Sequence, residues 1–183
     1  MRCVMRWFAL GLMLAAAATA PANAALKTGA KAPDFTARAT LGGKEFNFLL
    51  ADALKQGPVV LYFYPAAFTP GCTIEAHNFA EAVPDFKALG ASVIGVSRDD
   101  IKTLNRFSVE ECRSAFPVAA DPGGEVTKAY DAQLSSLLSI ADRTSYVISP
   151  GGTIVYAYRA LDPDHHVSNT LNAVKTWSKN QKK

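Results

Sequence analysis

The chain has 183 residues, of which 49% are hydrophobic and 19% are charged, and its formal net charge is +3. This composition is typical of a globular protein with enough apolar residues for a sizeable core. A charge so close to neutral argues against a nucleic-acid-binding role and against electrostatic attachment to an anionic membrane.

The first 24 residues have the pattern of a secretory signal peptide. Two arginines precede an apolar run over residues 7–18, and residues 22–24, Ala-Asn-Ala, form a small-x-small cleavage site. The run is short for a membrane span. We therefore expect cleavage after Ala24, no stable membrane insertion afterwards, and a mature chain of residues 25–183 in the periplasm or otherwise exported. Cleavage would remove both arginines and no acidic residue, which lowers the formal net charge from +3 to +1.

The first strong element of the mature chain is a strand over residues 59–64, VVLYFY, because a continuous apolar and aromatic run suits a strand covered on both faces. Apolar residues at helical spacing follow from Cys72 to Leu89. Pro84 is expected to start a new turn or to kink this helix, and Gly90 to end it. A second buried strand is predicted over residues 92–97, SVIGVS.

The second half of the chain continues the alternation of helices and strands. The predicted elements are a helix over 99–116 with Ile101, Leu104, Ser108 and Cys112 on one face, a short strand over 116–120, a turn and short helix over 121–132, a hairpin of strands 144–149 and 153–159, and an amphipathic helix over 165–179. The pattern predicts an α/β fold in one domain, residues 25–183, with a mixed central sheet and helices on both faces.

Cys72 follows Thr69-Pro70-Gly71 at the expected first turn of a helix. Unpaired backbone amides and the positive end of the helix dipole favour a thiolate there. Thr69 can offer a hydroxyl, while Pro65 and Pro70 stiffen the loop and leave the amides of Gly71 and Cys72 free to bind an oxygen. The stretch predicts a preorganised pocket for a small polar electrophile.

The spacing Pro65-x-x-x-Thr69-x-x-Cys72 is similar to the active-site motif of the peroxiredoxins, and LYFYP…TPGCTIEA resembles their bacterioferritin-comigratory, or PrxQ-type, branch. The segments APDFT, LGASVIGVS, FPVAAD and RTSYVISPGGTI fall where that branch has matching segments, so the resemblance covers nearly all of the mature chain. It implies a thioredoxin-like (peroxiredoxin) fold. It also implies a thiol-dependent peroxidase that reduces hydrogen peroxide and organic hydroperoxides without a metal or an organic cofactor.

The resemblance assigns a role to each matching residue. Cys72 would be the peroxidatic cysteine, which attacks the peroxide and becomes a sulfenic acid. Thr69 would hold the peroxide in line, Pro65 would shield the sulfenic acid from solvent, and Arg143 would favour the thiolate and steady charge on the peroxide oxygens. The backbone amides of Gly71 and Cys72 would bind the peroxide.

The resolving cysteine is where the sequence departs from many members of the branch. They carry it five residues after the peroxidatic cysteine, and His77 stands there. Other members place it on the next crossover helix, and Cys112 falls in such a segment. We therefore expect an intramolecular disulfide between Cys72 and Cys112, which would require local unwinding if the sulfurs start far apart.

Alternatives remain open for Cys112 and for the whole chain. Cys112 can be a buried structural thiol of a one-cysteine peroxidase, because Glu110 and Glu111 would raise its pKa and slow it as a nucleophile. The chain can also be a non-enzymatic redox sensor or holdase. A thioredoxin-like disulfide reductase or an exported copper chaperone would need a further cysteine at the positions held by Glu75 and Ala76.

The other candidate residues have simpler interpretations. Glu75 is expected to favour the helix dipole or to pair locally, and we place it outside the catalytic set. His77 is interpreted as a substitution on the helix surface. His165 and His166 are interpreted as a solvated helix start, because adjacent histidines on a helix point in different directions. The expected partners are a hydroperoxide and a thioredoxin-like or other exported thiol reductant, and we expect a monomer.

Overall fold

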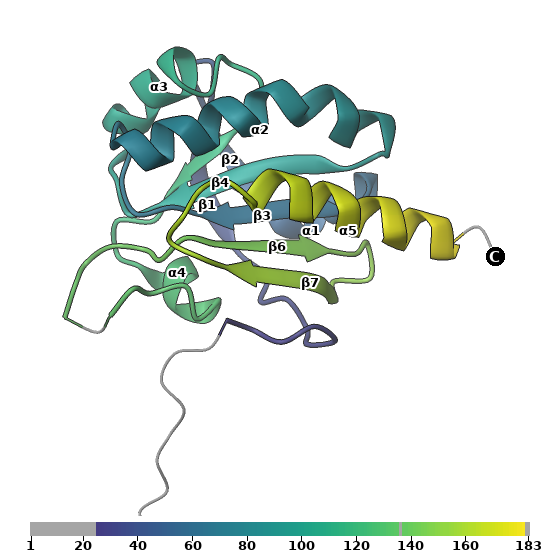
Figure 1. Cartoon of the computed structure of the whole chain (residues 1–183). Helices are drawn as coiled ribbons and strands as arrows, with labels where there is room; N and C mark the ends of the chain where they lie inside the picture. The colour runs from purple at the N-terminus through teal and green to yellow at the C-terminus, as the bar shows by residue number, and fades with distance from the viewer. Residues whose placement is uncertain (1–24, 136, 182–183) are drawn as a thin grey trace, which may run out of the picture.

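The computed structural model describes residues 25–135 and 137–181, so the predicted signal peptide lies outside the described residues. Seven strands of this part form one mixed sheet in the order β2-β1-β5-β4-β3-β6-β7 (Figure 1). β3 pairs in parallel with β4, and β4 with β5, whereas the remaining pairs are antiparallel. The strands are β1 (Thr36–Leu41), β2 (Lys44–Leu49), β3 (Val59–Phe63), β4 (Ser92–Ser97), β5 (Val118–Ala120), β6 (Thr144–Ile148) and β7 (Ile154–Arg159).

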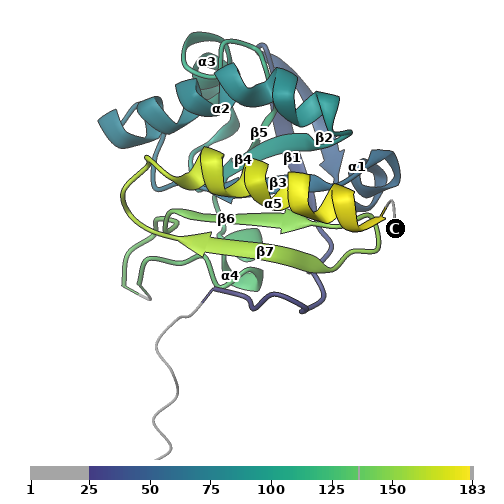
Figure 2. The same ribbon diagram turned by 45° about the vertical axis from the view of Figure 1, so that its right-hand side comes forward.

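Helices cover both faces of the sheet, as predicted (Figures 1 and 2). They are α1 (Leu50–Gln56), α2 (Pro70–Ala88), α3 (Ile101–Glu110), α4 (Glu125–Ala129) and α5 (His166–Gln181). The helices α2, α3 and α5 pack on one face, and α1 and α4 lie on the other. The predicted α/β fold with a mixed central sheet is therefore confirmed.

The central strand β3 separates two apolar cores. Val60, Tyr62 and Tyr64 point into the core under α2, α3 and α5, whereas alternate residues such as Leu61 and Phe63 point into the other. Each strand residue is fully buried, as its continuous apolar run predicted. The loop to α2 therefore starts from one of the least mobile parts of the molecule.

The helix predicted over residues 99–116 is shorter in the structure. Asp100 caps its start by accepting a 2.8 Å hydrogen bond from the Thr103 amide. The helix α3 ends at Glu110, and Arg113 and Ser114 have φ values of 52° and 54°. Because this left-handed backbone cannot continue a helix, Cys112 lies in the turn that follows α3 rather than on its apolar face.

Other boundaries differ by a few residues, and one region was not predicted. The helix α2 starts at Pro70, two residues before the predicted start, and continues through Pro84. The hairpin β1–β2 and the short helix α1 were missed. A signal for the hairpin was present, since Gly42 and Gly43 form its turn with φ values of 57° and 75°, a geometry that glycine adopts readily.

Within residues 25–135 and 137–181, no helix has the length and apolar character needed to cross a membrane.

Candidate active site

Cys72 lies in the first turn of α2, directly after the loop that leaves β3. Thr69 is the N-cap residue and Pro70 begins the helix, so Cys72 lies in the turn whose first amides have no acceptor inside the helix. The Cys72 side chain is 1% exposed. The predicted position of Cys72 at a helix start is correct, and the partial positive charge there favours a thiolate.

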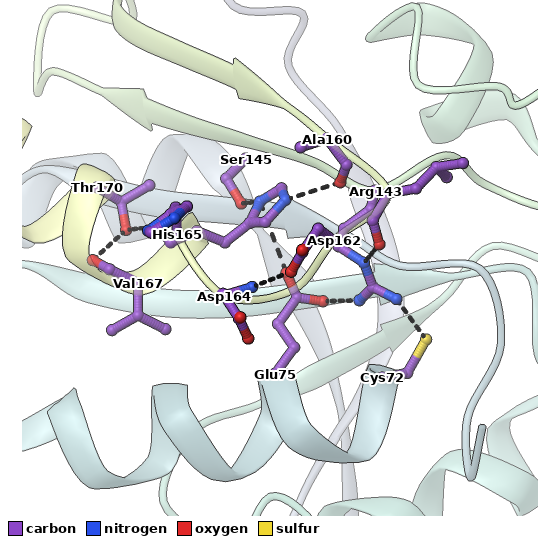
Figure 3. A network of polar contacts seen from close by, with 12 residues as sticks. Cys72, Glu75, Arg143, Ser145, Ala160, Asp162, Asp164, His165, Val167 and Thr170 are labelled. Atoms are coloured by element: carbon purple, nitrogen blue, oxygen red, sulfur yellow. Dashed lines mark hydrogen bonds and ion pairs between the residues drawn. The ribbon is translucent and has the colours of Figure 1, made fainter. Parts of the chain in front are cut away.

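Arg143 reaches Cys72 from the neighbouring strand, since it lies just before β6, which pairs with β3. β3 and β6 are antiparallel neighbours with Phe63 opposite Thr144, which places Arg143 beside the start of the loop that carries Cys72. The Arg143 Nη2 donates a 3.5 Å hydrogen bond to the Cys72 sulfur (Figure 3). Its Nε donates to the Leu161 carbonyl at 2.8 Å, which fixes the plane of the guanidinium.

Glu75 is the first functional candidate that the sequence interpretation left out. Its side chain is fully buried, and its Oε2 accepts a hydrogen bond in an ion pair with Arg143 Nη1 (Figure 3). It lies three residues after Cys72 and so shares one face of α2 with it. Burial raises the pKa of Glu75 to about 8, and the charge of Arg143 opposes that rise. The same guanidinium therefore contacts both a sulfur and a carboxylate.

His166 lies behind Glu75, which corrects the prediction of a solvated pair of histidines. Its ring is fully buried, whereas His165 is exposed. Its Nε2 lies 3.0 Å from the Ala160 carbonyl oxygen, and its Nδ1 lies 2.8 Å from the Ser145 hydroxyl. Burial lowers the pKa of His166 to about 4. No group of three His, Cys, Asp or Glu side chains placed to hold a metal occurs among residues 25–135 and 137–181.

The loop before α2 carries the other predicted site residues. Pro65 is half-buried at its start, and the exposed Thr69 at its end donates a hydroxyl hydrogen bond to the Ala66 carbonyl at 2.9 Å. The amides of Gly71 and Cys72 donate to no other group within the described residues. Their position in the first turn of α2 leaves both amides without an acceptor inside the helix.

Two further features hold this loop in place. The Ala67 amide and the Ser97 hydroxyl both donate 2.8 Å hydrogen bonds to Asp99, which lies just beyond β4. Phe68 has a φ of 63°, a strained value for an aromatic residue, and its ring packs edge-on against Phe107. Strain of this kind persists only where the surroundings enforce it, and it is common beside active sites.

Glycine at position 71 has a steric reason. A Cβ built there would lie 3.1 Å from the Arg143 Nη2, closer than an ordinary van der Waals contact. The absence of a side chain at Gly71 therefore allows the guanidinium to approach Cys72.

Cys112 is a second buried cysteine on the same side of the sheet as Cys72, and the structure has no disulfide between them. Burial, and to a lesser degree Glu111, raises the pKa of the Cys112 thiol, so the expected rise is present but burial rather than the two glutamates is its main cause. Two contacts between polar side chains join the segment around Cys112 to α2. His77 contacts Glu111 at 2.8 Å, so His77 is more than a surface substitution, and Arg113 contacts Glu81 at 3.1 Å.

Comparison with known proteins places this geometry in a family. Residues 28–157 match the model of the AhpC/TSA family. A putative chloroplastic peroxiredoxin Q of Oryza sativa subsp. indica is 31% identical over 92% of this chain and 82% of its own length. Peroxiredoxin Bcp of Xanthomonas campestris pv. campestris is 34% identical over 66% of this chain and 78% of its own.

A solved structure agrees with these relatives. The crystal structure of peroxidoxin BcpB from Mycobacterium tuberculosis superimposes with a TM-score of 0.75 and 30% identity, over 82% of this chain and 97% of that one. The thioredoxin-like peroxiredoxin fold that the sequence implied is thereby confirmed. The chain belongs to the AhpC/TSA family, in its PrxQ/Bcp-type branch of peroxiredoxins, and is a thiol-dependent peroxidase.

Proposed function

We propose that Cys72 is the cysteine that reduces the hydroperoxide. The observation that carries this proposal is the hydrogen bond from Arg143 to the Cys72 sulfur at the start of α2. The thiolate attacks the terminal peroxide oxygen, an S–O bond forms and the O–O bond breaks. Cys72 becomes a sulfenic acid, and the departing oxygen takes up a proton and leaves as water or an alcohol.

The surrounding groups act on charge and position. The Arg143 guanidinium and the free amides of Gly71 and Cys72 stabilise negative charge as it moves from sulfur to the peroxide oxygens. The Thr69 hydroxyl turns from the Ala66 carbonyl to hold the peroxide in line with the sulfur. Pro65 closes the other side of the pocket against water. No metal or organic cofactor takes part.

We further propose that Cys112 resolves the sulfenic acid. Its thiol attacks the Cys72 sulfur, which forms a disulfide within the chain and releases one water molecule. Both cysteines are buried on different elements, so α2 and the turn after α3 must unwind locally first. Burial raises the pKa of the Cys112 thiol, which favours reaction only after that turn has opened to solvent.

Steady-state turnover with hydrogen peroxide and a thioredoxin-type reductant tests both assignments. Cys72→Ser is expected to abolish activity, and wild-type activity in this variant would overturn the first proposal. Cys112→Ser is expected to keep one rapid reduction of peroxide and to lose turnover with thioredoxin. If turnover of Cys112→Ser with thioredoxin were unchanged, the protein would be a one-cysteine peroxidase with a structural Cys112.

The cellular setting is also a proposal. The signal-peptide pattern of residues 1–24 supports export to the periplasm, with residues 25–183 as one monomeric domain. An exported thiol protein would then return electrons to the disulfide. Sequencing the N-terminus of the protein from a periplasmic fraction is expected to begin at Ala25. Full-length protein confined to the cytoplasm would contradict the proposal, and light scattering of the purified chain tests the monomer.

A further inference from the structure

A carboxylate oxygen without a partner lies at the centre of the site. Glu75 uses Oε2 for Arg143, whereas its Oε1 is buried and forms no hydrogen bond within the described residues. His166 Nδ1 lies 3.6 Å from this oxygen, just beyond hydrogen-bonding distance. An ionised carboxylate oxygen left this way is costly, so a proton is expected close to it.

The surroundings of His166 decide which ring nitrogen can exchange a proton. The Ala160 carbonyl can only accept, so the His166 Nε2 beside it must carry a hydrogen. That leaves Nδ1 as the nitrogen that gains or loses a proton, facing Glu75 and the Ser145 hydroxyl, which can donate or accept. The ring is therefore oriented by groups that take no part in the reaction.

Other charged or titratable groups near His166 do not replace Glu75 as the partner of its Nδ1. Arg143 lowers its pKa, whereas Asp142 and Asp162 raise it, and burial is the largest cause of the lowered value. The ring of Tyr158 packs edge-on against it at 4.8 Å. Burial also raises the pKa of Glu75, so both members of the pair resist being charged.

The charges of the buried cluster show when a proton is needed. With Cys72 as a thiolate, Arg143 as a cation and Glu75 as a carboxylate, the cluster would carry a net negative charge away from water, which is unfavourable. One proton in the space between Glu75 and His166 makes it neutral. When the sulfur is uncharged, Arg143 and Glu75 balance each other and this proton becomes unfavourable.

We propose that Glu75 and His166 together hold one proton while Cys72 is a thiolate, and release it when the sulfur becomes uncharged. His166 is then a positioning residue that acts on Cys72 through Glu75 and Arg143. The proposal rests on Cys72 being the reacting cysteine. It also balances the reaction, because reduction of a peroxide by a thiolate consumes one proton at the departing oxygen, and the released proton offsets that uptake.

Proton release on alkylation tests the proposal without enzyme turnover. Reduced protein with Cys112→Ser is treated with iodoacetamide in the presence of a pH indicator, at a pH where ultraviolet absorbance shows that Cys72 is a thiolate. Alkylation of a thiolate releases only iodide, so any proton must come from a coupled group. We expect about one proton per alkylated Cys72. Release of no proton would overturn the proposal.

A matched pair of variants tests the role of His166. In His166→Gln the amide can still donate to the Ala160 carbonyl, but nothing replaces Nδ1. We expect the release to fall well below one proton per alkylated Cys72. The midpoint of the alkylation pH profile should rise by about one pH unit, so that alkylation is about tenfold slower on the acidic side of the midpoint. His165→Gln, at the exposed neighbour, is expected to behave as the wild type. Equal behaviour of the two variants would contradict a role for His166.

Nuclear magnetic resonance of protein that keeps both Glu75 and His166 tests the proposal even if His166→Gln fails to fold. The carboxyl carbon of Glu75 and Nδ1 of His166 are compared between the thiolate form and Cys72→Ser. One of them is expected to lose its proton in Cys72→Ser, and identical spectra would overturn the proposal. Failure of the catalytic assignment looks different, because Cys72→Ser would then retain peroxidase activity whatever these signals show.

Discussion

The ion pair of Arg143 gives a stability prediction whose size depends on the state of Cys72. Arg143 contacts both the Glu75 carboxyl group and the Cys72 sulfur, and the exposed fractions of the Arg143 and Glu75 side chains are 5% and 0%. Removing one partner of a buried pair costs about 3 to 5 kcal/mol when it leaves the other charge uncompensated. A remaining hydrogen bond from Arg143 to a charged Cys72 sulfur would offset about 1.5 to 3 kcal/mol of this cost.

Glu75→Gln is therefore expected to cost about 3 to 5 kcal/mol of unfolding free energy in a Cys72→Ser background. With Cys72 present as a thiolate the cost should be smaller by about 1.5 to 3 kcal/mol. Urea unfolding of the four proteins under reducing conditions, analysed as a double-mutant cycle, measures the difference. Glu81→Gln, which removes an exposed pair on the same helix, should cost at most about 1 kcal/mol. Equal costs of Glu75→Gln in both backgrounds would refute the coupling.

Three further predictions follow from single contacts. Gly71→Ala should lower the rate constant for the reaction with peroxide, because its Cβ would displace Arg143. The melting temperature should not fall, since alanine favours a helix by about 1 kcal/mol over glycine. Reduced stability with full activity would contradict this prediction. His77→Gln should speed disulfide formation by Cys112 by up to about fivefold in quenched-flow alkylation. The lost contact with Glu111 is partly exposed and contributes at most about 1 kcal/mol to the closed state. Slower disulfide formation would count against the opening step. Burial lowers the pKa of His166 from 6.5 to about 4, so between these pH values the unfolded chain binds a proton that the folded chain does not, and the free energy of unfolding should fall as the pH drops. Urea unfolding of His166→Gln should show a weaker dependence of this free energy on pH. An unchanged dependence would contradict the prediction.

The parts of the site that the sequence predicts are those set by local chemistry. Cys72 could be placed at a helix start because Thr69-Pro70-Gly71 precedes it, and the strand before it is a continuous apolar run. Glu75 could have been included from its spacing, since residues three apart on a helix share a face. It was left out because an acidic residue one turn into a helix already has an explanation in the helix dipole, although Phe79, Val83 and Phe86 continue the apolar face on which it lies.

Other parts depend on contacts between distant segments. Arg143 lies beside Cys72 only because β6 pairs with β3, and the residue was identified through the family resemblance alone. His166 becomes buried only when α5 packs on the sheet beside α2, a contact that helical periodicity does not encode. The length of α3 was misjudged because the left-handed residues that follow it are Arg113 and Ser114, which are not typical helix terminators.

The most direct test of the account is the intact mass of the reduced mature protein after one equivalent of hydrogen peroxide, with a digest to locate the change. The expected change is the loss of two hydrogens, with Cys72 joined to Cys112 inside one chain. Added oxygen on Cys72 with Cys112 still a free thiol would contradict the resolving role. A protein in which Cys72 remains unmodified would contradict the central claim that this cysteine reduces the peroxide.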